Sequence, residues 1–171
     1  MADNLLIVGA GVYGAVAHEI ALSTKQFQKI DFIDDYSKVS FRGFSTKGDF
    51  SALEELRKDY NCIFVAIGNP TVRKQIVKKI MHDTTYRLVS LISPSAYVSP
   101  SASVGEGCII EPMATVHTAV VLGTGCLISA GAVINHAAVC YPYCHVDCNA
   151  TVAGGATVPE ETKVESNTVF K

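Results

Sequence analysis

Two histidines in the second half of the chain carry the side chains best suited to proton transfer. His136 and His145 lie nine residues apart. A histidine changes charge near neutral pH, so a neutral imidazole can take a proton from an alcohol or an amine. For His136, spacing alone leaves open a solvated surface position or a packing contact. His18 and His82 fall within expected helices, where we expect surface positions.

A glycine-rich run near the start of the chain could bind phosphate. Gly9-Ala10-Gly11-Val12-Tyr13-Gly14 follows the apolar run Leu5–Val8 and precedes apolar residues at helical spacing. Backbone amides at the start of such a helix favour phosphate groups. Asp34, twenty residues beyond Gly14, completes a dinucleotide-binding pattern. An NAD domain normally has a second mononucleotide half, and this half of the chain is short for one. From the residues alone, the ligand could be NAD or another molecule that carries phosphate.

Six cysteines could serve disulfides, a metal or redox chemistry. No secretory signal is expected, because Asp3 and Asn4 stand where a basic segment should be. No stretch reaches the roughly 18 apolar residues of a membrane span, so we expect a cytoplasmic protein with reduced thiols. Cys108, Cys126 and Cys144 follow one another at intervals of eighteen residues. In the repeat described below, this interval stacks one cysteine on each coil of a packed wall, which gives no tetrahedral cage, so no metal is expected. A net charge of −2 without a basic face argues against a nucleic-acid partner.

The second half carries a strict six-residue repeat. From Ile92 one slot recurs through thirteen hexads, and twelve of its thirteen residues are aliphatic. The residue four positions after each is always small. Neither an α-helix nor a simple strand has this period, whereas a hexapeptide β-helix does, with three hexads in each coil of a triangular prism. In this register His136 occupies the third position of its hexad and faces outward.

The sequence of residues 1–91 predicts a small α/β domain, and we expect residues 92–171 to form the second domain. Residues 1–91 hold 22 charged residues against 7 in residues 92–169, which places the boundary near Leu91. Asn69 and Pro70 supply the start of a helix that continues to about Met81. Alternation of strands and helices predicts a Rossmann-like parallel sheet. Four runs are typical of its buried strands: Leu5–Val8, Ile30–Ile33, Ile63–Ile67 and Arg87–Leu91.

The whole chain resembles the NeuD/PglD-type sugar acyltransferases, a family of sialic acid O-acetyltransferases and UDP-amino-sugar N-acetyltransferases. The resemblance implies a Rossmann-like N-terminal domain followed by a left-handed parallel β-helix that assembles as a homotrimer. Its motifs occur in the family's order: Gly9-Ala10-Gly11-Val12-Tyr13-Gly14, Phe32-Ile33-Asp34-Asp35, Val65-Ala66-Ile67-Gly68-Asn69, Leu91-Ile92-Ser93-Pro94-Ser95-Ala96, Asn135-His136, His145 and Ala153-Gly154-Gly155-Ala156.

The resemblance also implies a function. It implies transfer of an acetyl group from acetyl-CoA to a hydroxyl or amino group of a nucleotide-activated sugar, for a bacterial surface glycan, with His136 as general base. The family's acetyl-CoA site corresponds here to His145, Ala153 and Gly154. Its nucleotide-sugar site corresponds to Gly11, Val12, Tyr13, Asp34 and Asn69.

Two departures from the family pattern bear on activity. Many relatives follow the catalytic histidine with an acid that can orient the imidazole, whereas this chain has Ala137. Asn135, Asp147 or a group of a neighbouring subunit could take that role. Val12-Tyr13 stand where relatives often carry Gly-His. Because the acid after His136 is missing, a non-catalytic β-helix trimer that binds a nucleotide sugar or a protein partner stays as the alternative.

Overall fold

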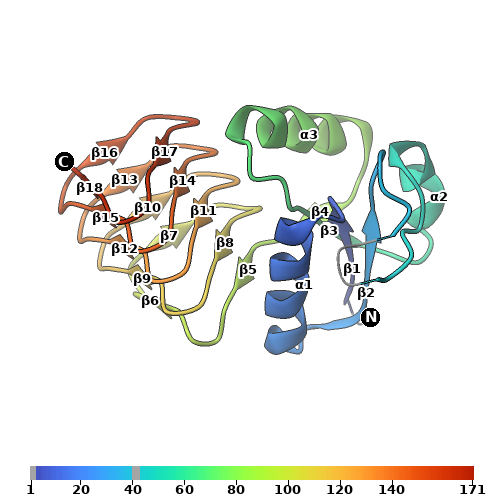
Figure 1. Ribbon diagram of the computed structural model, residues 1–171, viewed down its shortest axis with the longest axis horizontal. Coiled ribbons are helices and arrows are strands. Elements are labelled where there is room, and N and C mark those ends of the chain that lie inside the picture. The colour runs from blue at the N-terminus through green and yellow to red at the C-terminus, as the bar shows by residue number, and fades with distance from the viewer. Residues whose placement is uncertain (1–2, 40–42) are drawn as a thin grey trace. The chain divides into compact units, whose positions relative to one another are not determined.

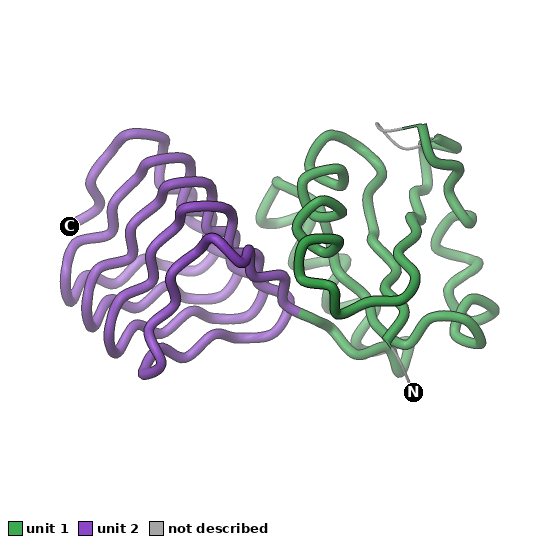
Figure 2. The backbone as a smooth tube through the Cα atoms, turned by 90° about the horizontal axis from the view of Figure 1, so that it is seen from below, with its two compact units in different colours: residues 1–89 green, residues 90–171 purple. Residues whose placement is uncertain are grey.

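The computed structural model describes residues 3–39 and 43–171. The chain forms two compact units, residues 1–89 and residues 90–171 (Figure 2). The first is an α/β domain with a four-stranded parallel sheet, and the second is a parallel β-helix with three walls (Figure 1). The α/β domain and the hexapeptide β-helix predicted from the sequence are thereby confirmed. In the described ranges, no helix is both long and apolar enough to cross a membrane.

The sheet of the first unit has the order β2-β1-β3-β4, with all strands parallel. The strands are β1 (Asp3–Val8), β2 (Phe27–Ile33), β3 (Cys62–Val65) and β4 (Arg87–Leu88). The helices are α1 (Val12–Thr24), the 3₁₀ helix η1 (Phe50–Ala52), α2 (Leu53–Leu56) and α3 (Pro70–Asp83). The fourth strand is shorter than predicted, because Leu91 pairs with Ile109 and belongs to the β-helix.

The β-helix consists of two-residue strands, each of which adds to one of three walls. The first wall contains β5 (Leu91–Ile92), β8 (Ile109–Ile110), β11 (Leu127–Ile128), β14 (His145–Val146) and β17 (Lys163–Val164). The second wall contains β6 (Tyr97–Val98), β9 (Thr115–Val116), β12 (Val133–Ile134), β15 (Thr151–Val152) and β18 (Val169–Phe170). The third wall contains β7 (Ser103–Val104), β10 (Val121–Leu122), β13 (Val139–Cys140) and β16 (Thr157–Val158).

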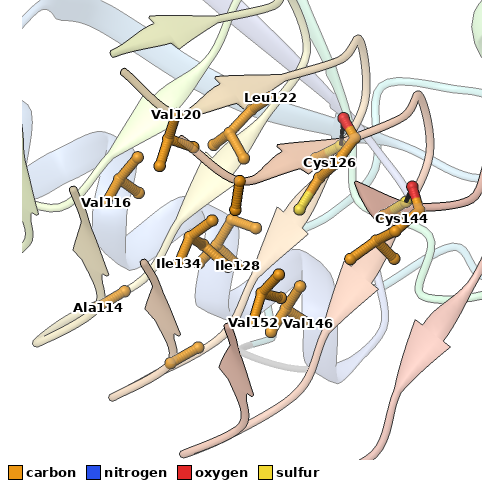
Figure 3. Packing of buried hydrophobic residues seen from close by; sticks show 14 of the residues in the cluster. Ala114, Val116, Val120, Leu122, Cys126, Ile128, Ile134, Cys144, Val146 and Val152 are labelled. Carbon is orange, nitrogen blue, oxygen red and sulfur yellow. Dashed lines mark hydrogen bonds between the residues drawn. The ribbon is translucent and has the colours of Figure 1, made fainter. Parts of the chain in front are cut away.

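The aliphatic slot of the repeat forms the core of the β-helix. Each strand pairs with the strand eighteen residues later, so Ile128 stacks between Ile110 and Val146. Figure 3 shows Ile128 and Val146 among the buried side chains of this core. Because each coil buries its apolar face only on its neighbours, the stack is stabilised coil by coil.

Four of the six cysteines contribute to this packing as free thiols. Cys108, Cys126 and Cys144 occupy the small slot on successive coils, and each donates its S–H to a backbone carbonyl at a corner, at 3.0 to 3.3 Å. Cys140 fills an aliphatic slot, where burial raises the pKa of its thiol to about 12. These four thiols therefore pack as small apolar side chains.

Most corners of the β-helix turn through one residue with left-handed backbone angles. Glycine meets this requirement at Gly155 (φ 70°), but Ala119 (φ 58°) and Ala137 (φ 55°) carry a side chain there. That conformation costs an L-residue about 1–2 kcal/mol. The hydrogen bonds between coils hold these corners in place.

Candidate active site and the cavity of the α/β unit

His136 lies at the corner between β12 of the second wall and β13 of the third wall, and it is exposed. Its carbonyl oxygen accepts a hydrogen bond from the amide of Gly155, 2.9 Å away, in the next coil. Its own amide donates to Oδ1 of Asn135 (2.8 Å), and its Nδ1 lies 2.9 Å from the same oxygen. Of the side chains in this chain that could orient the imidazole, Asn135 contacts the ring.

The His136 ring lies over Gly154, the residue at the equivalent corner one coil later. A Cβ atom at Gly154 would lie 2.8 Å from both Cε1 and Nε2 of His136, and 3.3 Å from Nδ1. The backbone angle of Gly154 is not one that requires glycine, so the ring itself is what excludes a side chain there. Ala153 precedes Gly154, and the structure therefore brings three sequence-predicted residues together at one edge of the β-helix.

His145 opens β14 on the first wall, with 13% of its side chain exposed. Its Nε2 lies 3.1 Å from Oγ of Ser129 and 3.9 Å from Oδ1 of Asp147. Asp147 also forms an ion pair with Lys163 at 3.1 Å. Burial would raise the pKa of Asp147, but hydrogen bonds from the Cys148 amide and from Lys163 outweigh it and lower the pKa to about 2. A negative charge therefore stays beside His145 throughout the neutral range.

His136 and His145 lie on different sides of the β-helix. His136 is at the corner where the second and third walls meet, and His145 faces outward from the first wall, which is opposite that corner. A side of six residues is at most about 20 Å long, so a corner lies roughly 15 Å from the opposite wall. One chain alone does not bring the two imidazoles together. Among the described residues, no group of three or more His, Cys, Asp or Glu could hold a metal ion.

The glycine-rich run joins β1 to α1, and two of its glycines are required by packing. Gly9 has a φ of 102°, and a Cβ there would lie 2.9 Å from the carbonyl oxygen of Ala66. A Cβ at Gly14 would collide with the carbonyl oxygen of Gly9. Gly11 differs, because its φ is −76° and a Cβ would meet no atom within 4 Å. The fold does not require glycine at the start of α1, so the surface there is open to a ligand.

Two other residues predicted for the nucleotide-sugar acceptor site, Asp34 and Asn69, accept hydrogen bonds from backbone amides. Asp34 accepts hydrogen bonds from the amides of Ala10 (2.8 Å), Tyr36 (2.8 Å) and Ser37 (2.9 Å). Burial would raise the pKa of Asp34, but these amides hold it below its usual range. Asn69 caps α3 by accepting from the amide of Val72 at 3.0 Å. Asp34 therefore ties the glycine-rich run to the end of β2, and Asn69 begins α3.

A cavity of about 300 Å³ opens where β1, β2 and β3 end. Apolar side chains including Ile67 and Phe50 line it, together with the charged residues Asp35 and Lys79. Oδ1 of Asp35 accepts from the Phe50 amide at 2.8 Å, and Nζ of Lys79 lies 5.7 Å from the centre of the Phe50 ring. In the described part of the chain, neither charge forms an ion pair. Of the predicted acceptor residues, Asp34 lines the cavity, and these do not: Gly11, Val12, Tyr13 and Asn69.

Sequence reasoning missed Phe50 and Lys79. They come from η1 and the middle of α3, and no motif marks either of them. Asp35 was visible as the neighbour of Asp34 in the Asp34-Asp35 pair after β2. The missing signal is tertiary, because only the packing of α3 and η1 beside the sheet edge brings these side chains to one cavity.

A parallel α/β domain followed by a hexapeptide β-helix with a histidine at an open corner defines the class of hexapeptide-repeat transferases. Residues 4–80 match the model described as PglD N-terminal domain, and residues 101–136 match that of the bacterial transferase hexapeptide (six repeats). The acetyltransferase domain of PglB from Neisseria gonorrhoeae FA1090, solved with acetyl coenzyme A, superposes with a TM-score of 0.93 at 30% identity, over 99% of this chain and 82% of that one. The chain belongs to the PglD-type hexapeptide-repeat sugar N-acetyltransferase family.

Two further relatives carry informative names. The UDP-N-acetylbacillosamine N-acetyltransferase of Bacillus subtilis (strain 168) is 34% identical over 111 residues, which are 63% of this chain and 50% of that protein. The chain thus spans about half the length of that curated relative. A histidine-to-asparagine mutant of perosamine N-acetyltransferase from Caulobacter crescentus, in complex with CoA and GDP-perosamine, superposes with a TM-score of 0.81 at 25% identity, over 100% of this chain and 90% of that one.

Proposed function

We propose that this chain transfers the acetyl group of acetyl-CoA to the amino group of a nucleotide-activated sugar. The observation that carries the proposal is the imidazole of His136, held by Asn135 at an open corner of the β-helix in a member of this family. The activities named for the relatives support nitrogen as the acetylated atom and a nucleoside diphosphate as the activating group.

The proposed reaction is a direct acyl transfer. The amine nitrogen of the sugar attacks the thioester carbonyl carbon, so that a C–N bond forms while the carbonyl oxygen gains negative charge. His136 accepts the proton from that nitrogen at Nε2, because Nδ1 is engaged by Asn135. The C–S bond then breaks, and the proton passes to the sulfur, which leaves as the thiol of coenzyme A.

His145 is suited to donate a hydrogen bond to the thioester oxygen. Because His145 lies on the wall opposite His136, one chain cannot supply both groups to one acetyl group. We therefore assign the two imidazoles of each site to neighbouring copies of the chain, in a homotrimer with one site at each interface. Ala153 and Gly154, beside His136, would then border the arm of acetyl-CoA.

The cavity of the α/β unit is suited to the nucleoside end of the acceptor. Its apolar lining fits the face of a nucleobase, Oδ2 of Asp35 can accept an N–H, and the ammonium of Lys79 can donate to a carbonyl or phosphate oxygen. The open surface at Gly11 leaves amides at the start of α1 accessible to phosphate.

The test is His136→Ala, assayed by release of coenzyme A thiol with UDP- and GDP-linked amino sugars. We expect the variant to lose about 10²–10⁴-fold in kcat, because general base catalysis has that magnitude. His82→Ala is the matched control, since that histidine is exposed at the end of α3. Turnover of His136→Ala within threefold of the parent would refute the base assignment. A parent protein that binds nucleotide sugars but releases no thiol would favour the non-catalytic alternative.

A further inference from the structure

Asn135 makes two hydrogen bonds through a single atom, and this identifies that atom. A backbone amide can only donate, so the atom 2.8 Å from the amide of His136 must be the carbonyl oxygen of the Asn135 side chain. The same oxygen lies 2.9 Å from Nδ1 of His136. An amide oxygen has no proton to give, so Nδ1 must be the donor of this second bond.

This pair of contacts determines where the proton of the neutral imidazole lies. With Nδ1 protonated, Nε2 holds the lone pair, and Nε2 is the ring nitrogen farther from Asn135. Turning the ring over would place a carbon atom against Oδ1. Moving the proton to Nε2 would place the lone pair of Nδ1 against Oδ1. Either change would lose the bond. The side chain of Asn135 is itself held, because rotating its amide would also break the bond to the His136 backbone.

We infer that Asn135 is a positioning residue that holds His136 in the Nδ1–H tautomer, with Nε2 as the atom that takes the proton from the acceptor amine. This inference rests on the proposed acetyl transfer for its function, but not for its geometry. Asn135 does by a neutral hydrogen bond what a carboxylate does in other acid–histidine pairs. In the described residues, no ion pair includes His136, so Asn135 fixes the ring without adding a charge beside it.

The experiment compares Asn135→Ala with Asn135→Asp in the full chain. The tautomer is read from the nitrogen NMR shifts of the His136 imidazole, assigned with His136→Gln. We expect the parent and Asn135→Asp to show protonated Nδ1, and Asn135→Ala to show a mixture. In the thiol-release assay, Asn135→Ala should lose about 10–100-fold in kcat with KM values within about threefold, since the ring is mispositioned but the binding surfaces remain.

Asn135→Asp should keep kcat within about threefold at high pH. Its activity should fall at a higher pH than that of the parent as the solution is acidified, because a carboxylate beside the ring favours the protonated imidazole. An unchanged tautomer in Asn135→Ala, or an unchanged pH profile in Asn135→Asp, overturns the inference. Absence of thiol release by the parent would overturn the proposed function alone, because the NMR comparison needs no turnover.

Discussion

Gly154→Ala should separate the position of the His136 ring from the stability of the β-helix. The added methyl carbon would lie 2.8 Å from Cε1 and Nε2 of His136, whereas carbon atoms in contact are normally about 3.5–4.0 Å apart. The ring must therefore move by roughly 0.7 Å or more. The bond from Nδ1 to Asn135 starts at 2.9 Å, and a shift of this size directed away from Asn135 takes it beyond the range of a hydrogen bond.

The expected cost to activity follows from that displacement. A misplacement of about 1 Å at a reacting group can lower kcat about 10²-fold, so we expect Gly154→Ala to lose about 10–100-fold in thiol release. Its melting temperature should change little, because the backbone of Gly154 suits alanine and the ring can swing into solvent. A loss of order at the ring should also appear as a shifted His136 imidazole signal in NMR spectra.

Gly155→Ala is the matched control one residue further on. A Cβ at Gly155 would meet no atom within 4 Å, but its φ of 70° is strained for alanine. We expect it to cost about 1 kcal/mol of stability, a fall of about 2–4 °C in melting temperature, with kcat within threefold of the parent. If Gly154→Ala keeps the parent kcat and the parent imidazole signal, the ring does not lie over Gly154 and the reasoning fails.

Three further predictions concern other parts of the chain. Lys79→Met should weaken the binding of UDP or GDP about tenfold in calorimetric titrations, since it removes the ammonium of the cavity; unchanged affinity would exclude Lys79 from the nucleotide site. The folded state lowers the pKa of Asp147 from 3.8 to about 2. Its ionised carboxylate therefore contributes at most about 2 kcal/mol to the free energy of unfolding. This contribution is present above about pH 4 and is lost as the pH falls through about 2. In urea unfolding, Asp147→Asn should therefore be less stable than the parent at pH 6 and should approach it at pH 2, and a constant difference would contradict the ion-pair argument. Ala119→Gly should stabilise the β-helix by about 0.5 kcal/mol, because it relieves the left-handed corner, and a lower unfolding midpoint would contradict this.

The repeat made the β-helix predictable because its period is long and strict. A slot that stays aliphatic every six residues has one structural solution, and the register also places His136 at an outward corner. The α/β unit was predictable in outline, because Asn69 and Pro70 begin α3 and buried runs form β1 and β3. The prediction of a surface position for His18 was wrong, because His18 is 7% exposed and its ring lies 5.3 Å from that of Phe32.

The detailed interactions of the candidate site could not be predicted from the sequence. That Asp34 binds the amide of Ala10 depends on how closely β2 ends beside the glycine-rich run. That Asn135 binds the ring depends on the corner geometry, in which one oxygen reaches both a backbone amide and Nδ1. Lys79 and Phe50 are distant in sequence, and only the tertiary fold brings them to the cavity.

The placement of His136 and His145 on opposite sides of the β-helix has a consequence for genetics. In a trimer whose sites lie between chains, each site takes His136 from one chain and His145 from the next. A His136→Ala chain still supplies an intact His145 to the site on one of its sides. A His145→Ala chain still supplies an intact His136 to the site on its other side. Two alleles that are each inactive would then complement when expressed together. Random assembly of equal amounts leaves both histidines intact at about a quarter of the interfaces, so about a quarter of the parental activity should return.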